Sequence, residues 1–226
     1  MNPYVAYLPE SAIESNSSEL LSAFARDRGP VTAPPVPVDD IAEKHLRLTI
    51  DLTDLWARWQ ESDVFGALYA DDDAIFIDER LDPVEQPEAE VSYRFALAHE
   101  LGHWCQHRAY FYADTSQEWL SAESEQPSIV CHWSDADARI EYQADCFAAW
   151  LLMPTPLVHS AWNDRFGGAR LPYLGRAGEP AWGSVVGEFA SVFGVPPRVV
   201  RGRLADLGLL GCASESGDAF VRDSWL

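Results

Sequence analysis

Residues 94–107 read Arg-Phe-Ala-Leu-Ala-His-Glu-Leu-Gly-His-Trp-Cys-Gln-His and contain a His-Glu-x-x-His pattern. The apolar periodicity of residues 88–112 predicts a helix around this pattern. Side chains four positions apart on a helix lie about 40° apart around its axis, so His99 and His103 can bind one Zn²⁺ ion together. Glu100 lies about 60° from His103, which suits a base that reaches a water on the metal better than a third ligand. One helical turn thus predicts two metal ligands and a general base.

A second pattern, Glu141-Tyr-Gln-Ala-Asp145, lies on a helix that we expect over residues 135–153, ending before a proline. A catalytic zinc needs a third protein ligand and leaves its fourth position to water, and Glu141 can be that ligand. Asp145 shares its helical face and can accept the second ring N–H of His99 or His103, which fixes the tautomer of that ring. The alternative is that both patterns are polar faces of exposed helices, but their occurrence together favours the metal site.

The segments upstream of the first pattern read as strands. Arg47–Leu52 alternates and predicts one strand, and residues 66–70 and 74–78 predict a hairpin with Asp71–Asp73 at its turn. The three aspartates lack the spacing of an EF-hand loop, which favours a solvated turn over a calcium site. The expected fold class is therefore α+β. A small sheet packs against the active-site helix and a second metal-ligand helix, followed by a helical C-terminal segment.

The composition limits the choice of partners and compartment. The 226 residues carry 16 Lys and Arg against 36 Asp and Glu, a formal net charge of −20, which disfavours direct contact with nucleic acid and favours a basic protein partner. The N-terminus does not read as a secretory signal, and no apolar run approaches the ~20 residues that span a membrane. The 4 cysteines form no Cys-x-x-Cys pair, which favours free thiols in a reducing cytosol.

Both patterns lie within longer stretches that closely resemble the ImmA/IrrE-type metallopeptidases. The resemblance rests mainly on Arg94–His103 followed by His107, and on Glu141–Pro154. Further matches are the segment that precedes the active-site helix and two parts of the C-terminal helical segment, namely Ile75–Asp78, Phe189–Pro196 and Arg203–Leu209. The resemblance extends over about residues 36–210.

The resemblance implies a cytoplasmic zinc endopeptidase that cleaves a DNA-binding helix-turn-helix repressor and so derepresses genes of a mobile element or a stress response. By matching motifs, it assigns His99, His103 and Glu141 as zinc ligands and Glu100 as the catalytic base. The residues before Val36 are too few for the N-terminal helix-turn-helix domain of many relatives, and no counterpart of the sensor domain of the radiation-response member is expected. Mn²⁺ accepts the same donor types as Zn²⁺ and remains an alternative metal.

A related class of metallopeptidases uses a third histidine as a ligand. Its pattern, His-Glu-x-x-His-x-x-Gly-x-x-His, requires Gly and His at positions that Gln106 and Ala109 occupy here. That class is therefore excluded, and the class with a glutamate ligand remains.

Three parts of the chain are expected. Residues 1–35 form an N-terminal extension, residues 36–156 the metallopeptidase core, and residues 157–226 a helical segment packed on that core. Several further elements are expected within them, namely a short helix at Ser18–Arg28, a proline-rich loop at 29–37, an acidic loop at 113–133, and helices at 182–193 and 197–207. Asp39 and Asp40 can cap a helix that carries Ile41 and His45.

Four other polar side chains can contribute to catalysis. A peptidase needs a hydrogen-bond donor for the oxyanion that forms on the attacked carbonyl, and His132, Tyr110 and Tyr142 are candidates. His107 follows His103 by one turn and can contact substrate or support a ligand, and a packing role is equally open. Cys105 and Cys146 lie near the two patterns, where buried structural thiols are the common case.

Two other functional classes compete with the peptidase. The chain can be a non-proteolytic antirepressor or antitoxin-type protein that sequesters a basic partner with its acidic surface. Phe189–Leu210 also resembles a helix-turn-helix, but Arg198, Arg201 and Arg203 stand against Glu188 and Asp206 in a chain of strongly negative charge. Packing on the catalytic domain is therefore the preferred interpretation of this segment over DNA binding.

Overall fold

The computed structural model describes residues 7–60, 64–109, 129–132, 138–169 and 179–210. Its sheet contains the four strands β1 (Thr49–Thr53), β2 (Val64–Tyr69), β3 (Ala74–Asp78) and β4 (Ile129–His132), in the order β1-β3-β2-β4. β3 runs parallel to β1 and antiparallel to β2, and β2 also pairs antiparallel with β4. The fold is the α+β arrangement that the sequence predicts.

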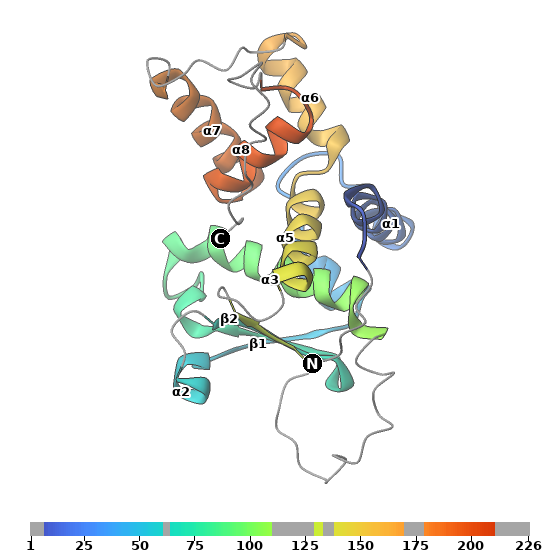
Figure 1. The fold of residues 1–226 in the computed structure, drawn as a ribbon, viewed down its shortest axis with the longest axis vertical. Coiled ribbons are helices and arrows are strands. Elements are labelled where there is room, and N and C mark those ends of the chain that lie inside the picture. Colours follow the sequence, from blue (N-terminus) through green and yellow to red (C-terminus); the bar gives the residue numbers. More distant parts are fainter. Residues whose placement is uncertain (1–6, 61–63, 110–128, 133–137, 170–178, 211–226) are drawn as a thin grey trace.

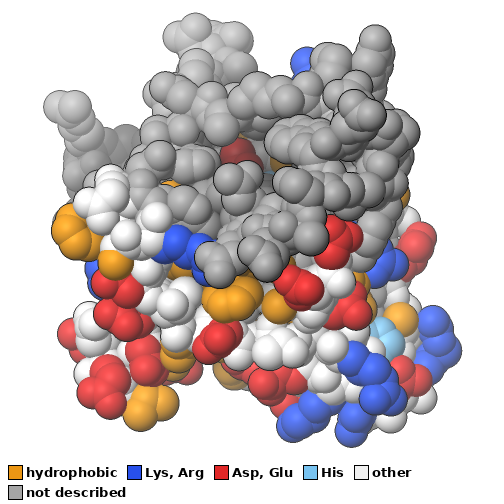
Figure 2. All heavy atoms as spheres, turned by 90° about the horizontal axis from the view of Figure 1, so that it is seen from below, with side chains coloured by type: hydrophobic (Ala, Val, Ile, Leu, Met, Phe, Trp, Pro, Cys, Tyr) orange, Lys and Arg blue, Asp and Glu red, His pale blue; other side chains and the backbone are white. Residues whose placement is uncertain are grey.

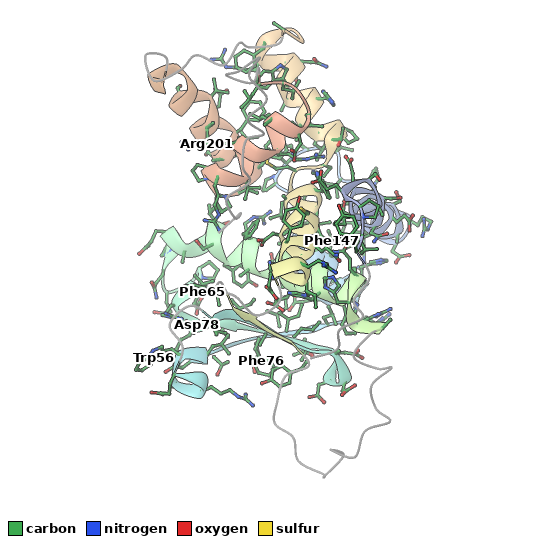
Figure 3. All side chains as sticks on the ribbon, in the orientation of Figure 1. Trp56, Phe65, Phe76, Asp78, Phe147 and Arg201 are labelled. Carbon is green, nitrogen blue, oxygen red and sulfur yellow. The ribbon has the colours of Figure 1, made fainter. Side chains whose placement is uncertain are left out.

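The β2–β3 hairpin is confirmed, and its residues alternate between the two faces of the sheet as a period of two requires. Ile75 and Ile77 bury against the helices in the main core, whereas Ala74 and Phe76 belong to a small apolar cluster on the opposite face, where Figure 3 shows Phe76. The predicted aspartate turn contains the 3₁₀ turn Ala70–Asp72. This alternation directs the large aliphatic side chains toward the helix that carries the first pattern.

β4 differs from the expectation for its segment. Residues 113–133 were expected to form a loop, but Ile129–His132 pairs with β2, with a register shift between Val64 and Gly66. β4 has four residues, lies in an acidic and Ser-rich part of the sequence, and pairs with the distant strand β2, so its local signal is weak. β2 therefore lies inside the sheet.

Two helices cross above the sheet. α3 (Glu90–Gln106) lies on the face of β2 and β3, and α5 (Ala138–Leu152) packs on the other side of α3 (Figure 1). The approach is close at Gly102, where an added Cβ would lie 3.0 Å from the backbone of Ala144. The short 3₁₀ turn Pro87–Ala89 precedes α3. Both helices fall within the ranges that the sequence predicts, 88–112 and 135–153, although residues 110–112 and 135–137 lie outside the described part.

The N-terminal segment contributes to the same core. α1 (Glu10–Arg28) begins earlier than the helix predicted at Ser18, and it packs along α5 with Ile13, Leu20 and Phe24 buried. The packed part of the chain therefore includes residues before Val36. Polar residues dominate the first half of α1, which explains why its periodicity is weak in the sequence.

The helix that follows α1 differs in its capping from the one that the sequence predicts. A π-helix spans Asp40–His45, as expected for a helix that carries Ile41 and His45, but neither aspartate side chain caps it. The carboxylate of Asp39 instead accepts a hydrogen bond from the hydroxyl of Tyr93 at 2.8 Å. α2 (Leu55–Trp59) follows β1, and a 3₁₀ turn, Glu79–Leu81, follows β3.

Three helices follow the second pattern. α7 (Glu179–Phe193) and α8 (Pro197–Asp206) confirm the two helices predicted at 182–193 and 197–207. α6 (Thr155–Phe166) was not predicted, because Pro154 indicates the end of α5, whereas it also stands at the N-cap of a new helix. Trp162 of α6 is fully buried in the main core. No helix within the described part of the chain combines the length and apolar character needed to cross a membrane.

A buried arginine ties these helices to the rest of the fold. Arg203 of α8 donates from Nε to the carbonyl of Met153 at 3.1 Å, and from Nη2 to Glu14 at 3.1 Å and Thr155 at 2.6 Å. These contacts join α1, the α5–α6 junction and α8. The described part of the C-terminal segment is thus packed on the same core as α3 and α5.

Candidate metal centre

Three side chains from α3 and α5 converge on one point. His99 and His103 project from successive turns of α3, and their Nε2 atoms lie 3.0 Å apart. Glu141 of α5 reaches the same point, with Oε2 at 3.1 Å from His99 Nε2 and Oε1 at 3.5 Å from His103 Nε2. In the part of the chain that the structure describes, these three residues form the group of side chains suited to hold a metal ion.

The separations of these atoms fit a tetrahedral zinc site. Zinc binds nitrogen and oxygen donors at about 2.0–2.1 Å, so two ligands of one tetrahedral ion lie about 3.3 Å apart. The separations of 3.0, 3.1 and 3.5 Å bracket that value. Two imidazoles and one carboxylate also form a donor set that catalytic zinc uses, with a position left for water. The residues present therefore fit the ion that the sequence implies.

Asp145 orients the ring of His99. Its Oδ1 lies 2.7 Å from His99 Nδ1, and both side chains are buried. A carboxylate accepts hydrogen bonds, so His99 carries its proton on Nδ1 and directs the lone pair of Nε2 toward His103 and Glu141. Of the two histidines that the spacing left open for Asp145, the structure places His99 against it.

The environment favours the protonation states that metal ligands require. Burial lowers the pKa of His103, which keeps its imidazole neutral. Burial alone would raise the pKa of Glu141, but the close approach of the His103 and His99 ring nitrogens outweighs it and holds that pKa well below its usual range. A neutral histidine and an ionised glutamate are the forms that bind a cation.

Glu100 lies between α3 and the sheet. Its side chain is fully buried, and the carboxylate lies so close to Gly66 of β2 that an added Cβ at that position would overlap Oε1. Gly66 sits beside the irregularity in the β2–β4 pairing. The absence of a side chain at Gly66 thus makes room for Glu100, a relation between distant segments that the sequence does not reveal.

The other candidates from the sequence have different surroundings. His107 is buried beside His103, with the two Nδ1 atoms 3.0 Å apart. The hydroxyl of Tyr142 donates to Glu10 of α1 at 2.7 Å, so it joins two helices. Tyr110 lies outside the described residues, and for His132 only the backbone, in β4 opposite Val64, is described.

Gln143 is a site residue that sequence reasoning missed. It is fully buried, and its Oε1 lies 3.0 Å from His107 Nε2. It stands inside the Glu141–Asp145 pattern, but that pattern alone gives no reason to pair it with His107. The contact depends on how α3 and α5 pack.

The arginines of the α7–α8 segment are engaged to different degrees. Arg203 is buried in the network with Glu14 and Thr155. The guanidinium of Arg198 lies over the ring of Phe95 at 5.5 Å, and Arg201 is exposed on α8 (Figure 3). Packing on the core accounts for two of the three side chains, in agreement with the preferred interpretation of this segment.

The chain resembles known proteins in its sequence and in its structure. A family model described as the IrrE N-terminal-like domain, Peptidase_M78, matches residues 61–205. Among solved structures, the chain is similar to a Mycobacterium tuberculosis transcriptional regulator, with 16% sequence identity and a TM-score of 0.49. That match covers 87% of this chain and 48% of the regulator, so the chain spans about half of that protein's length. A search of curated proteins gives no significant match.

Proposed function

Because this chain belongs to the family of IrrE N-terminal-like domains, Peptidase_M78, we propose that it is a metal-dependent endopeptidase with Glu100 as its general base. The observation that carries the proposal is the convergence of His99, His103 and Glu141 from two packed helices. Their separations and the donor set suit zinc, which is the metal that we propose, with Mn²⁺ as the alternative.

The chemistry follows from the roles of these side chains. A bound zinc ion would supply a Lewis acid that polarises the scissile carbonyl and lowers the pKa of a water to about 7. Glu100 would take a proton from the attacking water and deliver it to the nitrogen of the leaving amine. Asp145 would hold His99 in the tautomer that presents Nε2.

The proposed substrate is a basic, DNA-binding repressor of the helix-turn-helix class, cleaved in the cytoplasm. This part of the proposal rests on the resemblance to the ImmA/IrrE-type metallopeptidases and on the net charge of −20. Figure 2 shows Asp and Glu side chains spread over the described part of one face of the molecule. Such a surface attracts a basic protein and repels the phosphates of free nucleic acid.

A second candidate function is sequestration of the same kind of partner without cleavage. The acidic charge favours it to the same extent, because attraction of a basic protein requires no catalytic group. Glu100 discriminates between the two functions, since a site that only binds metal has no use for a base at that position.

The test is the replacement Glu100→Gln, which keeps the size of the side chain but removes the base. We expect unchanged metal content and a fall in cleavage of the repressor by at least the ~10²–10⁴-fold that general acid–base catalysis contributes. Cleavage is measured as repressor fragments on a gel, and derepression with a reporter in cells.

Glu90→Gln is the matched control, because it makes the same chemical change on an exposed side chain of α3. It should cleave and derepress as the wild type does. Derepression without fragments, in wild type and Glu100→Gln alike, would reject the peptidase in favour of sequestration.

A further inference from the structure

A chain of buried polar side chains leads from His103 away from the three converging atoms. His103 Nδ1 lies 3.0 Å from His107 Nδ1, and His107 Nε2 lies 3.0 Å from Gln143 Oε1. All three side chains are completely buried between α3 and α5. This series of contacts starts at Nδ1 of His103, whereas Nε2 of the same ring faces His99 and Glu141.

The acceptor at the end of the chain sets the direction of both hydrogen bonds. An amide oxygen only accepts, so His107 must donate from Nε2 to Gln143. A neutral imidazole has a single N–H, which leaves a lone pair on His107 Nδ1. Complete burial of the His107 side chain favours the neutral form, because no water is there to stabilise a charged ring. His103 must then donate from its own Nδ1 to His107.

The consequence concerns the other nitrogen of His103. With the proton on Nδ1, Nε2 carries a lone pair that points toward His99 Nε2 and Glu141. Only this tautomer can bind a metal ion at that place. The hydrogen bond that Gln143 accepts thus determines, through His107, whether His103 has the tautomer that can bind a metal ion.

We propose that His107 and Gln143 are positioning residues that hold His103 in its metal-binding tautomer, as Asp145 does for His99. α5 then supplies one ligand, Glu141, the acceptor for His99, Asp145, and the acceptor for His107, Gln143. The inference rests on the proposed metal site.

A neutral amide suits this place better than a further acid. The region around α3, α5 and β2 already contains the buried carboxylates of Glu100 and Asp145 and the largely buried carboxylate of Glu141. Another carboxylate would add repulsion and a desolvation cost in a region of low dielectric. Gln143 accepts the hydrogen bond without adding charge.

The first test reads the tautomers directly in the full chain. Histidine-labelled, metal-free wild-type protein is examined by two-bond ¹H–¹⁵N NMR correlations. We expect the proton of His103 on Nδ1 and that of His107 on Nε2. A metal-free protein with the His103 proton on Nε2, or the His107 proton on Nδ1, would overturn the proposal.

The second test measures zinc affinity by competition with a chromophoric chelator. Gln143→Met keeps the length of the side chain but removes the acceptor, and we expect zinc affinity to fall by about 10–100-fold, as it does when an outer partner of a ligand is lost. Gln143→Glu restores an acceptor but adds a buried carboxyl group, so it should recover part of the affinity. Equal affinity in wild type and Gln143→Met would overturn the proposal.

Gln106→Met is the matched control. Gln106 is buried on α3, and its Nε2 donates to the backbone carbonyl of Gln143 at 3.1 Å. It therefore joins the same two helices but makes no hydrogen bond to the side chains of His103, His107 or Gln143. It should lower thermal stability as Gln143→Met does, yet leave zinc affinity unchanged. Equal losses of zinc affinity in Gln143→Met and Gln106→Met would show that Gln143 contributes only to packing.

The outcomes separate this inference from the proposed function. Failure of the wild type to bind zinc in the titration would reject the proposed metal site itself. Zinc binding that Gln143→Met leaves intact would reject only the positioning role. The tautomer measurement needs no metal and decides the direction of the hydrogen bonds independently.

Discussion

At the scale of single residues, the site depends on side chains that are small or neutral as much as on the ligands. Gly66 has no Cβ where Glu100 needs space, and Gln143 provides an uncharged acceptor where a fourth acid would be costly. Neither residue is itself a proposed metal ligand or the proposed base. In the function that we propose, Gly66 acts through the position of Glu100, and Gln143 through the tautomer of His103.

Gly66→Ala should impair catalysis while leaving the metal ligands in place. The added methyl group overlaps the buried carboxylate of Glu100, so that side chain or β2 must shift. A misplacement of about 1 Å can cost ~10²-fold in rate, and we expect a loss of that order in kcat/KM on the repressor with zinc affinity unchanged. Both quantities are measured on the purified protein.

Gly187→Ala is the control for Gly66→Ala. Gly187 is exposed on α7, and an added Cβ there meets no heavy atom of the described residues within 4 Å. It should leave cleavage unchanged and raise the free energy of unfolding by about 0.5–1 kcal/mol through helix propensity. Full activity in Gly66→Ala would show that Glu100 does not depend on the space at Gly66.

At the scale of elements, the close approach of α3 and α5 brings Glu141 to the two histidines. We expect Gly102→Ala to separate the helices, because the new Cβ would lie 3.0 Å from the backbone of Ala144, which cannot rotate away. Overpacking of this kind costs about 1–3 kcal/mol, partly offset by the helix propensity of alanine. Zinc affinity should fall together with the stability measured by urea unfolding.

Gly183→Ala provides the comparison for Gly102→Ala, because an added Cβ there meets no described heavy atom within 4 Å. It isolates the gain in helix propensity, about 1 kcal/mol. Equal gains in stability in both variants would contradict the close packing at Gly102.

The elements also show what the sequence predicts and what it does not. α3, α5 and the β2–β3 hairpin were predictable because apolar periodicity and turn residues are local signals. β4 was missed because its pairing is entirely with a distant strand, and α6 because a proline that ends one helix also begins the next.

For the site, the sequence predicted which residues share a helical face, and the structure brings His99, His103 and Glu141 together. The spacing of His99 and His103, and that of Glu141 and Asp145, was informative because helical geometry alone places each pair on one face. The pairing of Asp145 with His99 rather than His103, and the contact of Gln143 with His107, depend on how two helices pack. No pattern along the chain contains that information.

At the scale of the whole molecule, Arg203 joins segments from both ends of the described chain. We expect Arg203→Met to lower the free energy of unfolding by about 1–3 kcal/mol, because the buried carbonyl of Met153 loses its donor. The half-exposed carboxylate of Glu14 can rehydrate, which limits the loss. Arg201→Met on the exposed face of α8 should change stability by less than about 0.5 kcal/mol.

The ion pair between Arg203 and Glu14 can be checked by measuring how the free energy of unfolding of wild type and of Arg203→Met depends on pH. The hydrogen bond from Thr155 and the charge and hydrogen bond of Arg203 hold the pKa of Glu14 below its usual value, despite its partial burial. A carboxyl whose pKa is lowered on folding contributes stability above its unfolded pKa and loses it as pH falls through the folded pKa. The difference in the free energy of unfolding between wild type and Arg203→Met should therefore become smaller in acid. A difference that does not change with pH would exclude a role for Glu14.

The two helices that carry the proposed metal ligands come from distant parts of the chain, with His99 and Glu141 separated by 42 positions. An ion that binds only when α3 and α5 are packed together favours the folded chain over the unfolded one, by about 2.7 kcal/mol at a free concentration 100 times its Kd. In a cell, differences of 1–2 kcal/mol change protein abundance several-fold, because proteases remove unfolded chains. The supply of metal would thus govern the lifetime of this protein as well as its activity, and pulse-chase labelling in zinc-starved cells should show faster turnover.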